Sequence, residues 1–405
     1  MLYPDIFDRI KEAKEILKGV VHRTPLTRSY TFSRLTGGNI YLKLENLQKT
    51  GSFKPRGAYN KLWHLVKAKD IRECVTASSG NHAQGVAYAA TLLGVKSTIV
   101  MPKYTPVIKV VATKGYGANV ILHGRTYDDA YEYAVRLSKE RNIDFIHAFN
   151  DPYVIAGQGT IGLEIYEDLP NIDAVVVPIG GGGLISGIAI ALKNLKPNVK
   201  VYGVEASGAP SMKLSLEKGE IVKIRDIDTI ADGIAIKSPG DLTFKIVSEI
   251  VDDVLLVDDD EIVRAMFMLL ERCKLVAEPA GAVGVAAVLS GKIDVKEKNV
   301  AIVVSGGNVD MPLLSRVIDK ALVVEGREIR IQGVLNDRPG TLKEVLESIA
   351  KARANVISIE EDRVSPTVRI GKVEVTITLE VPDKESIDEI LRDLRRKGYE
   401  FKVAP

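Results

Sequence analysis

Cysteine is scarce in this chain of 405 residues, and its two cysteines, Cys74 and Cys273, lie far apart in the sequence. Two cysteines at this separation provide neither a disulfide framework nor a metal-ligand pattern. So low a cysteine count is typical of proteins in a reducing cytoplasm. No apolar run approaches the length that crosses a bilayer, and the first residues lack the charged and then apolar pattern of a secretion signal. The formal net charge is only +2, which favours neither nucleic acid nor an anionic membrane as a partner. We therefore expect a cytoplasmic protein without such partners.

What the chain does contain is a globular composition, with 46% hydrophobic and 27% charged residues. Its length is too great for one ordinary core and predicts two or three domains. The residue pattern changes near Glu325 and Gly326. We therefore expect a catalytic part over 1–325 and a separate C-terminal part over 326–405.

Short apolar strands alternate with helices between about residues 52 and 150. The expected strands are 74–77, 97–101, 119–122 and 144–147, and the expected helices are 82–93, 106–114 and 127–141. Such alternation indicates repeated βαβ units with a parallel sheet. We predict a small open α/β subdomain here.

A second α/β subdomain is expected from the rest of the catalytic part, with strands that are almost continuously apolar. The expected strands are 40–45, 174–177, 199–204 and 300–304, and the expected helices are 5–18, 259–273 and 279–290. Continuous apolar strands are typical of a sheet that is covered on both faces. The segment 211–250 is less regular, so we interpret it as a lid or a surface excursion.

The C-terminal part reads strand, helix, strand, strand, helix, strand. The strands are expected near 328–335, 355–363, 368–381 and 399–403, and the helices near 340–353 and 384–397. This order belongs to the ferredoxin-like split βαβ plan.

Lys54 is the first candidate for chemistry, between Phe53 and Pro55 in what we interpret as a loop flanked by Gly51 and Gly57. A solvated surface lysine is the simpler interpretation. However, Pro55 stiffens the following backbone, and an apolar wall from Phe53 would strip water from the amine and favour its neutral form. Such a lysine can form a Schiff base with an aldehyde cofactor.

Three further segments would serve the same kind of cofactor. They are Ser78-Ser79-Gly80-Asn81-His82, Gly180-Gly181-Gly182-Gly183-Leu184 and Ser305-Gly306-Gly307-Asn308. The second follows an apolar strand and precedes an apolar helix, so its amide groups and the helix terminus can hold an anion. It lacks the Gly-Lys-Ser/Thr ending of a P-loop, so it suits an anchoring phosphate ester better than a triphosphate.

With these motifs in view, the chain resembles fold-type II pyridoxal-phosphate enzymes, in the branch of threonine and serine dehydratases. The resemblance implies pyridoxal 5'-phosphate on Lys54 beside Phe53, with its phosphate at Gly180–Gly183 and Leu184. It also implies that Ser305 meets the pyridine nitrogen and that Asn81 meets the ring hydroxyl oxygen.

The resemblance also implies how the substrate is handled. The turn Ser78, Ser79, Gly80, Asn81 and His82 would hold the substrate carboxylate, although capping of a helix explains the two serines as well. Lys54 would take the α-proton, and Ser79 matches the residue that acts on the opposite face in serine-racemising relatives.

Threonine dehydration to 2-oxobutanoate and ammonia, with serine as a side substrate, is the function that this resemblance favours. A serine racemase or serine dehydratase is the enzymatic alternative. From a different class, the chain could be a catalytically dead sensor of amino acids, although the intact Lys54 motif argues against that.

Two weaker motifs remain in the catalytic part. Glu205, Ala209 and Ser211 align with a cation site of related racemases, but a serine stands where the pattern ends in an acidic residue. This makes a divalent metal doubtful and leaves a monovalent cation or a plain loop. Glu278 resembles a family segment near the active site, or is simply a carboxylate at a helix start.

The turn with Asp337, Pro339 and Gly340, together with Asn355 at the next strand, resembles an ACT regulatory domain. The resemblance implies that isoleucine or valine binds there and that the chain forms a homo-oligomer, a dimer or a tetramer. A plain dimerisation module is the alternative.

Overall fold

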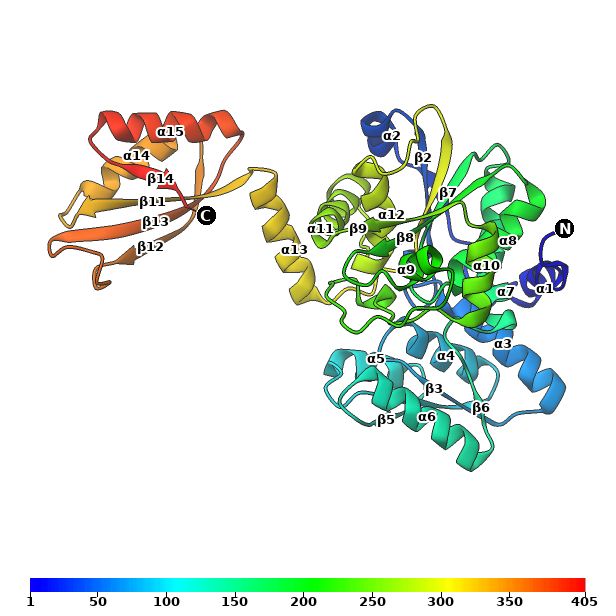
Figure 1. Cartoon of the computed structure of the whole chain (residues 1–405). Helices are drawn as coiled ribbons and strands as arrows, with labels where there is room; N and C mark the ends of the chain where they lie inside the picture. Colours follow the sequence, from blue (N-terminus) through cyan, green and yellow to red (C-terminus); the bar gives the residue numbers. More distant parts are fainter. Residues whose placement is uncertain (405) are drawn as a thin grey trace. The chain divides into compact units, whose positions relative to one another are not determined.

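The computed structural model describes residues 1–404, apart from the side chain of Lys384. Contacts divide the chain into two compact units, Met1–Val309 and Asp310–Pro405 (Figure 1). This division falls before helix α13 (Met311–Val324), whereas the sequence-based boundary at 325 falls after it. Over the described residues, no helix is both long and apolar enough to cross a membrane.

A six-stranded sheet forms the centre of the first unit, in the order β1-β2-β10-β7-β8-β9. The strands are β1 (Leu26–Arg28), β2 (Asn39–Leu44), β7 (Ala174–Pro178), β8 (Lys200–Ala206), β9 (Asp253–Val257) and β10 (Asn299–Val304). Only β1 runs antiparallel to its neighbour. Parallel strands need helical crossovers, which explains why both faces of this sheet are covered and why its central strands β7 and β10 are almost continuously apolar.

Helices pack on both faces of this sheet. They are α1 (Pro4–Ile16), α2 (Tyr30–Thr36), α7 (Pro152–Asp168), α8 (Gly183–Leu195), α11 (Asp259–Met268) and α12 (Pro279–Leu289). Val175 and Val177 join the core shared with α1, α7 and α8. The intervening Val176 lies against α12, where a side chain at Gly284 would touch it.

The small subdomain is a four-stranded parallel sheet in the order β5-β4-β3-β6, as the sequence predicted. Its strands are β3 (Glu73–Ala77), β4 (Lys96–Met101), β5 (Asn119–Leu122) and β6 (Asp144–Phe145). Its helices are α3 (Lys54–Lys69), α4 (Asn81–Leu92), α5 (Val107–Gly115) and α6 (Tyr127–Arg141). Cys74 packs with α3 and α4, and the next residue, Val75, packs with α6 on the opposite face. This alternation of side chains along a strand fills both cores.

The segment 211–250 is more regular than expected. It contains α9 (Ser211–Lys218), a 3-10 turn at Asp232–Ile234 and α10 (Asp241–Ile250). Both helices are short, and α9 depends on a remote carboxylate: Glu205 accepts hydrogen bonds from the amides of Met212 and Lys213 at 2.9 and 2.8 Å. A local pattern cannot reveal such a cap.

The helix expected over 259–273 also departs from expectation, since α11 ends at Met268 and Leu269–Cys273 form a π-helical turn.

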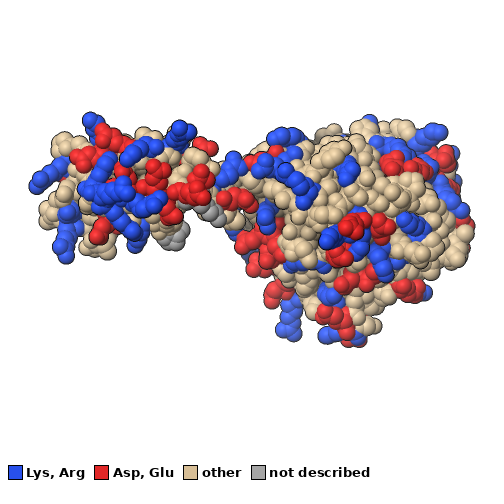
Figure 2. Space-filling view, turned by 90° about the horizontal axis from the view of Figure 1, so that it is seen from above, with Lys and Arg blue, Asp and Glu red and all other residues tan. Residues whose placement is uncertain are grey.

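The second unit has the predicted ferredoxin-like plan, with strand order β12-β13-β11-β14 and antiparallel pairing throughout. The strands are β11 (Glu328–Asn336), β12 (Asn355–Asp362), β13 (Lys372–Glu380) and β14 (Phe401–Val403), and the helices are α14 (Thr341–Lys351) and α15 (Lys384–Arg396). Ile331, Val375 and Ile377 pack with Val345 and Leu394 in its core. On the face drawn in Figure 2, acidic and basic residues are interspersed over each unit, in agreement with the small net charge.

Four charged side chains are buried together in the first unit: Lys43, Glu45, Arg56 and Glu164. Arg56 donates to Glu45 at 2.8 Å and to Glu164 at 2.6 Å, and Lys43 donates to Glu164 at 2.6 Å. Burial alone would lower the pKa of Arg56, but the two carboxylates outweigh burial and raise it. Two positive and two negative charges therefore compensate one another across β2, α3 and α7.

Removing one member of this buried charge cluster should leave the others uncompensated. We expect Glu164→Ala to lower the free energy of unfolding of the first unit by about 3–5 kcal/mol. The measurement is urea unfolding of the full chain. The control is Lys298→Ala, which breaks an exposed pair with Asp294 and should change little. Equal effects of the two variants would contradict the role of the cluster.

Candidate active site

Lys54 is the first residue of α3, and the loop that the sequence suggested ends just before it. Gly57 lies inside this helix, so our interpretation of it as part of a loop around Lys54 was wrong. A residue without a side chain is needed at position 57 because α3 packs closely on α7. A Cβ atom there would lie 2.8 Å from the carbonyl oxygen of Val154. Pro55 is in the first turn, where proline favours the start of a helix.

The loop before Lys54 is held to the end of β10. Ser52 and Gly306 form an antiparallel bridge, and the amide of Phe53 donates to the carbonyl oxygen of Ser305 at 3.1 Å. Lys54 of α3, at the start of the small subdomain, is thereby fixed beside Ser305 of the large one. The two lie more than two hundred positions apart in the sequence.

The amine of Lys54 has the environment that the sequence suggested. Its Nζ lies 4.9 Å from the centre of the Phe53 ring and 3.4 Å from the carbonyl oxygen of Ala148. Desolvation lowers the pKa of Lys54 to about 8, while the nearby charge of Glu278 acts in the opposite direction. A lysine with this pKa is a far better nucleophile and base near neutral pH than an exposed one.

The turn from Ser78 to His82 joins β3 to α4, with Asn81 as the first helical residue. The amide of Gly80 donates to the Ser78 hydroxyl at 3.3 Å. The ring of His82 is buried, with its Nε2 3.1 Å from the carbonyl oxygen of Ile146, and burial lowers its pKa to about 3. The neutral His82 ring is therefore engaged with the sheet.

The glycine loop joins β7 to α8, with Gly182 in the left-handed region at φ +91°. A side chain at Gly181 would lie 2.3 Å from the ring of Phe149, and the Thr243 hydroxyl donates to the Gly181 carbonyl oxygen at 2.6 Å. Packing therefore requires glycine here, besides any role in binding. Leu184 is buried in the first turn of α8, whose first amides have no acceptor within the helix and lie at its positive end.

Glu278 is the site residue that sequence reasoning undervalued. Its carboxylate oxygen accepts a hydrogen bond from Nδ2 of Asn81 at 2.7 Å, although it stands at the start of α12 and caps nothing there. Burial raises the pKa of Glu278 to about 7, and the charge of Asp232 adds to this, while the hydrogen bond from Asn81 opposes it. Its one signal in the sequence was the resemblance to a family segment near the active site, since a glutamate before a helix is common.

The weak cation motif has another use in the structure. Both carboxylate oxygens of Glu205 accept from amides of α9, and burial raises the pKa of this group to about 7. Ala209 and Ser211 are buried beside it. Over residues 1–404, no group of three or more His, Cys, Asp or Glu side chains is placed to hold a metal ion.

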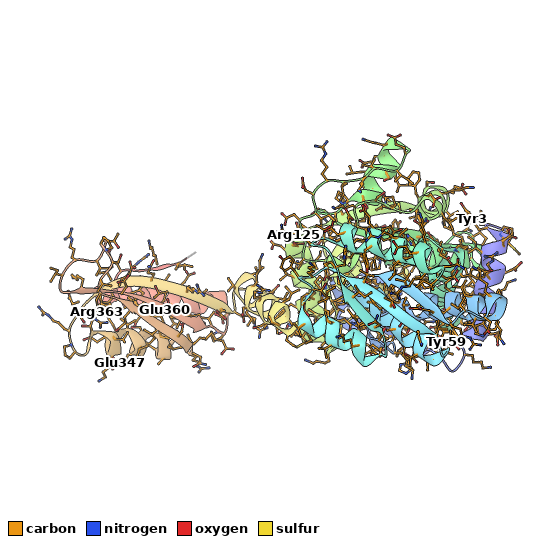
Figure 3. The ribbon with its side chains drawn as sticks, turned by 90° about the horizontal axis from the view of Figure 1, so that it is seen from below. Tyr3, Tyr59, Arg125, Glu347, Glu360 and Arg363 are labelled. Carbon is orange, nitrogen blue, oxygen red and sulfur yellow. The ribbon has the colours of Figure 1, made fainter. Side chains whose placement is uncertain are left out.

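The residues expected to bind an effector divide into two groups within one chain. Asp337 follows β11 and pairs with Arg363 at 3.2 Å. Arg363 comes directly after the end of β12 (Figure 3). Gly340, at φ +96°, precedes α14. Asn355 opens β12 opposite Glu380, whereas Asn336 faces Lys372 at the other end of β13. Eight residues of a strand separate these ends by about 25 Å.

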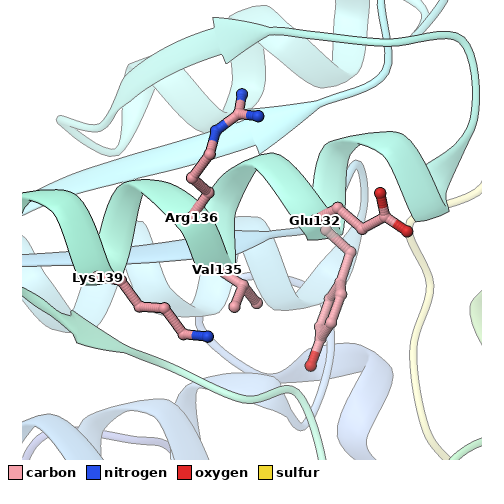
Figure 4. Close-up of a pocket in the computed structure, with 5 residues that line it drawn as sticks. Glu132, Val135, Arg136 and Lys139 are labelled. Carbon is pink, nitrogen blue, oxygen red and sulfur yellow. The ribbon is translucent and has the colours of Figure 1, made fainter.

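A surface hollow of about 310 Å³ lies on α6, outside the residues described above. Figure 4 shows that its lining side chains project from successive turns of one helix: Tyr131, Glu132, Val135, Arg136 and Lys139. It brings together no groups from different elements, so we assign it no chemistry.

Comparison with known proteins decides the family. Residues 17–306 match the model of the pyridoxal-phosphate dependent enzymes. The chain belongs to this family. As a pyridoxal-phosphate dependent enzyme it is 53% identical, over 97% of its length and 98% of the relative's, to an L-threonine ammonia-lyase of Thermotoga maritima.

Residues 325–397 match the model of the ACT domain, so the second unit contains an ACT domain. Among solved structures, the chain is similar to the processed form of threonine deaminase isoform 2 from Solanum lycopersicum, with a TM-score of 0.76, 39% identity and coverage of 80% of this chain and 90% of that one. It is also similar to maize serine racemase, with a TM-score of 0.74, 39% identity and coverage of 79% and 98%.

The residues of this pyridoxal-phosphate dependent enzyme fit the cofactor on chemical grounds. Lys54 offers a desolvated amine, and the start of α8 offers amides at a positive helix end. Asn81 offers an amide N–H and Ser305 a buried hydroxyl at the end of β10.

The pKa of Lys54 leads to a pH dependence of cofactor capture. Only the neutral amine attacks an aldehyde, so the rate at which the cofactor-free full chain takes up pyridoxal phosphate should rise with pH and level off above about 8. Stopped-flow absorbance between pH 6 and 10 measures this. A rate still rising at pH 10 would mean an ordinary lysine, with its pKa of 10.5.

Proposed function

We propose that this protein is a threonine ammonia-lyase that converts L-threonine to 2-oxobutanoate and ammonia and also accepts L-serine. The observation that carries the proposal is the desolvated Lys54, held beside the end of β10 in a chain that is similar over nearly its whole length to a relative of that name. The reaction removes the β-hydroxyl of the substrate as water, and water later replaces the amino group.

Lys54 has two roles in this proposal. Its amine would attach the cofactor. Once the amine of the substrate has taken its place there, the Lys54 amine would be free to take the substrate α-proton. Bound pyridoxal phosphate supplies a ring that accepts electrons and makes that proton acidic. Burial keeps enough of the amine neutral near pH 8 for the second role.

The substrate carboxylate binds at the turn from Ser78 to His82. The first amides of α4 lie at a positive helix end, which attracts an anion without any charged side chain. His82 is neutral there, so the helix start would hold the anion without a histidinium charge. Ser79 lies in the same turn. By the family resemblance, its hydroxyl would give or take a proton on the face of the substrate opposite Lys54.

The anchoring phosphate binds at Gly180–Gly183 and Leu184, where α8 begins. This loop contains no lysine or arginine, so main-chain donors alone hold the anion. Ser305 meets the ring nitrogen. Since a hydroxyl is too weak an acid to protonate that nitrogen, the ring withdraws electrons only moderately, which suits elimination of a leaving group.

Serine racemisation is the second candidate. Ser79 and the similarity to maize serine racemase favour it. A chiral assay for D-serine beside an ammonia assay with L-threonine and L-serine separates the two activities.

Replacing the proposed base tests the assignment directly. We expect Lys54→Ala to retain its fold and to lose ammonia release from L-threonine by at least about a thousandfold. Borohydride reduction of the wild type should leave the cofactor on the peptide that contains Lys54, as mass spectrometry would show. The matched control is Lys49→Ala in the exposed part of the preceding loop, which should retain activity. Unchanged turnover in Lys54→Ala, or an adduct elsewhere, would refute the role, and absence of any adduct would favour a catalytically dead sensor.

Regulation by an amino acid at the ACT domain is part of the proposal, with Asp337, Pro339, Gly340 and Asn355 as its ligands. These residues lie at opposite ends of β13 in one chain. Because β12 is an edge strand, antiparallel pairing of two copies along β12 would bring Asn355 of one copy to the Asp337 end of the other. The effector site therefore requires a homo-oligomer, with a dimer as the smallest unit.

Calorimetry of the full chain with isoleucine and with valine tests this site. We expect Asp337→Ala and Asn355→Ala each to weaken the binding of the effector by roughly tenfold, the contribution of a hydrogen bond to a charged group. Asn171→Ala in the first unit is the control and should bind normally. Light scattering should show at least a dimer. A monomer that binds the effector with full affinity would contradict the shared site.

We propose no monovalent cation at Glu205, because both of its carboxylate oxygens accept hydrogen bonds from amides of α9.

A further inference from the structure

Three side chains form a hydrogen-bonded chain along one wall of the site: Asn308, Asn81 and Glu278. Nδ2 of Asn308 donates to Oδ1 of Asn81 at 2.7 Å, and Nδ2 of Asn81 donates to a carboxylate oxygen of Glu278 at 2.7 Å. We call this the amide chain. It crosses from the end of β10 to the start of α4 and then to the start of α12.

The backbone holds the first member of the amide chain in place. The amide of Gly307 donates to the carbonyl oxygen of Gly51 at 2.8 Å, next to the bridge between Ser52 and Gly306. A side chain at Gly51 would lie 2.4 Å from Oδ1 of Asn308, and Gly51 has φ +72°. Glycine at this position therefore admits the Asn308 side chain.

The direction of the amide chain follows from one carbonyl oxygen. Asn308 contacts the carbonyl oxygen of Thr50 at 2.7 Å with the same nitrogen that contacts Asn81. Since a carbonyl oxygen only accepts, Asn308 must present its NH2 group there. Asn81 must then turn its oxygen to Asn308 and its NH2 group to Glu278.

The amide of Asn81 keeps one N–H beyond the one that Glu278 takes. Among the described residues, this second N–H has no acceptor. It belongs to the residue to which the family resemblance assigns the hydroxyl oxygen of the cofactor ring.

We propose that Asn308 and Glu278 are positioning residues that orient Asn81, so that one N–H of Asn81 is always presented to the cofactor oxygen. This inference rests on the proposed cofactor site. Asn308 acts by fixing the amide, and Glu278 acts as the acceptor at the other end. Glu278 has a second effect, because its negative charge favours the protonated form of Lys54.

Asn308→Asp tests the orientation and keeps the shape of the side chain. A carboxylate facing both the Thr50 carbonyl and Oδ1 of Asn81 repels both, so the amide of Asn81 turns over and directs its oxygen into the site. We expect the affinity of the full chain for pyridoxal phosphate to fall by about tenfold and the absorption band of the bound cofactor to shift. The matched control is Asn46→Asp, since Asn46 also donates to a backbone carbonyl, that of Val276 at 3.0 Å, but contacts no member of the amide chain.

Glu278→Gln separates orientation from charge. Its amide oxygen can still accept from Asn81, so the affinity for the cofactor should stay within about threefold of wild type. The lost charge should lower the pKa of Lys54. The pH dependence of acylation of Lys54 in the cofactor-free full chain, measured on its peptide by mass spectrometry, should therefore shift to lower pH in Glu278→Gln and not in Asn46→Asp.

The outcomes separate this inference from the proposed function. If Asn308→Asp folds and binds pyridoxal phosphate with the affinity and spectrum of wild type, the orienting role is wrong. An unshifted Lys54 profile in Glu278→Gln overturns the charge effect. If the wild type binds the cofactor and both variants behave as expected, yet no ammonia is released from L-threonine, the amide chain stands and the proposed substrate is wrong.

Discussion

The buried charge cluster of Lys43, Glu45, Arg56 and Glu164 is the interaction on which the geometry of the site depends. Burying four charges is costly, and well-packed apolar residues could give equal stability. The charges add geometric specificity. The guanidinium of Arg56 donates to Glu45 and to Glu164, which lie on different elements, and these hydrogen bonds form in only one arrangement of those elements. Arg56 stands two residues after Lys54 in the same first turn of α3. The cluster therefore joins the small subdomain to β2 and α7 at the point where the reactive amine begins.

The site itself consists of strand ends. The turn after β3, the glycine loop after β7 and Ser305 after β10 lie where a parallel strand gives way to a helix or a loop, and Lys54 begins α3 after the loop that follows β2. In open α/β sheets the carboxyl ends of strands form the natural crevice, and the following helix starts supply positive potential. The bridge between Ser52 and Gly306 joins the loops that follow β2 and β10, two neighbouring strands of the larger sheet, and so fixes the start of α3 beside the end of β10. Main-chain groups can then bind the anions, which leaves the amine of Lys54 free for the reaction.

Sequence reasoning identified the elements well and their relations poorly. Alternating strands and helices predicted both parallel sheets, and the C-terminal order predicted the ferredoxin-like sheet, because these patterns are local. Gly57 was misinterpreted because its reason is contact with α7, a hundred residues away. Helix α9 was missed because its cap, Glu205, belongs to β8. A residue whose role depends on a distant partner carries no local pattern.

Glu278 shows the same limit at the level of chemistry. Its sequence context, a glutamate before a proline at a helix start, suits a surface capping residue as well as a buried acid. Only the fold places Asn81 and Lys54 beside it, and only burial separates its pKa, about 7, from that of an exposed carboxyl. The charge of ionised Glu278 favours the ammonium form of Lys54, while desolvation has the larger and opposite effect and lowers the pKa of Lys54 to about 8. The reactivity of Lys54 is therefore a property of two chain segments that are separated by more than two hundred residues and meet only in the folded protein.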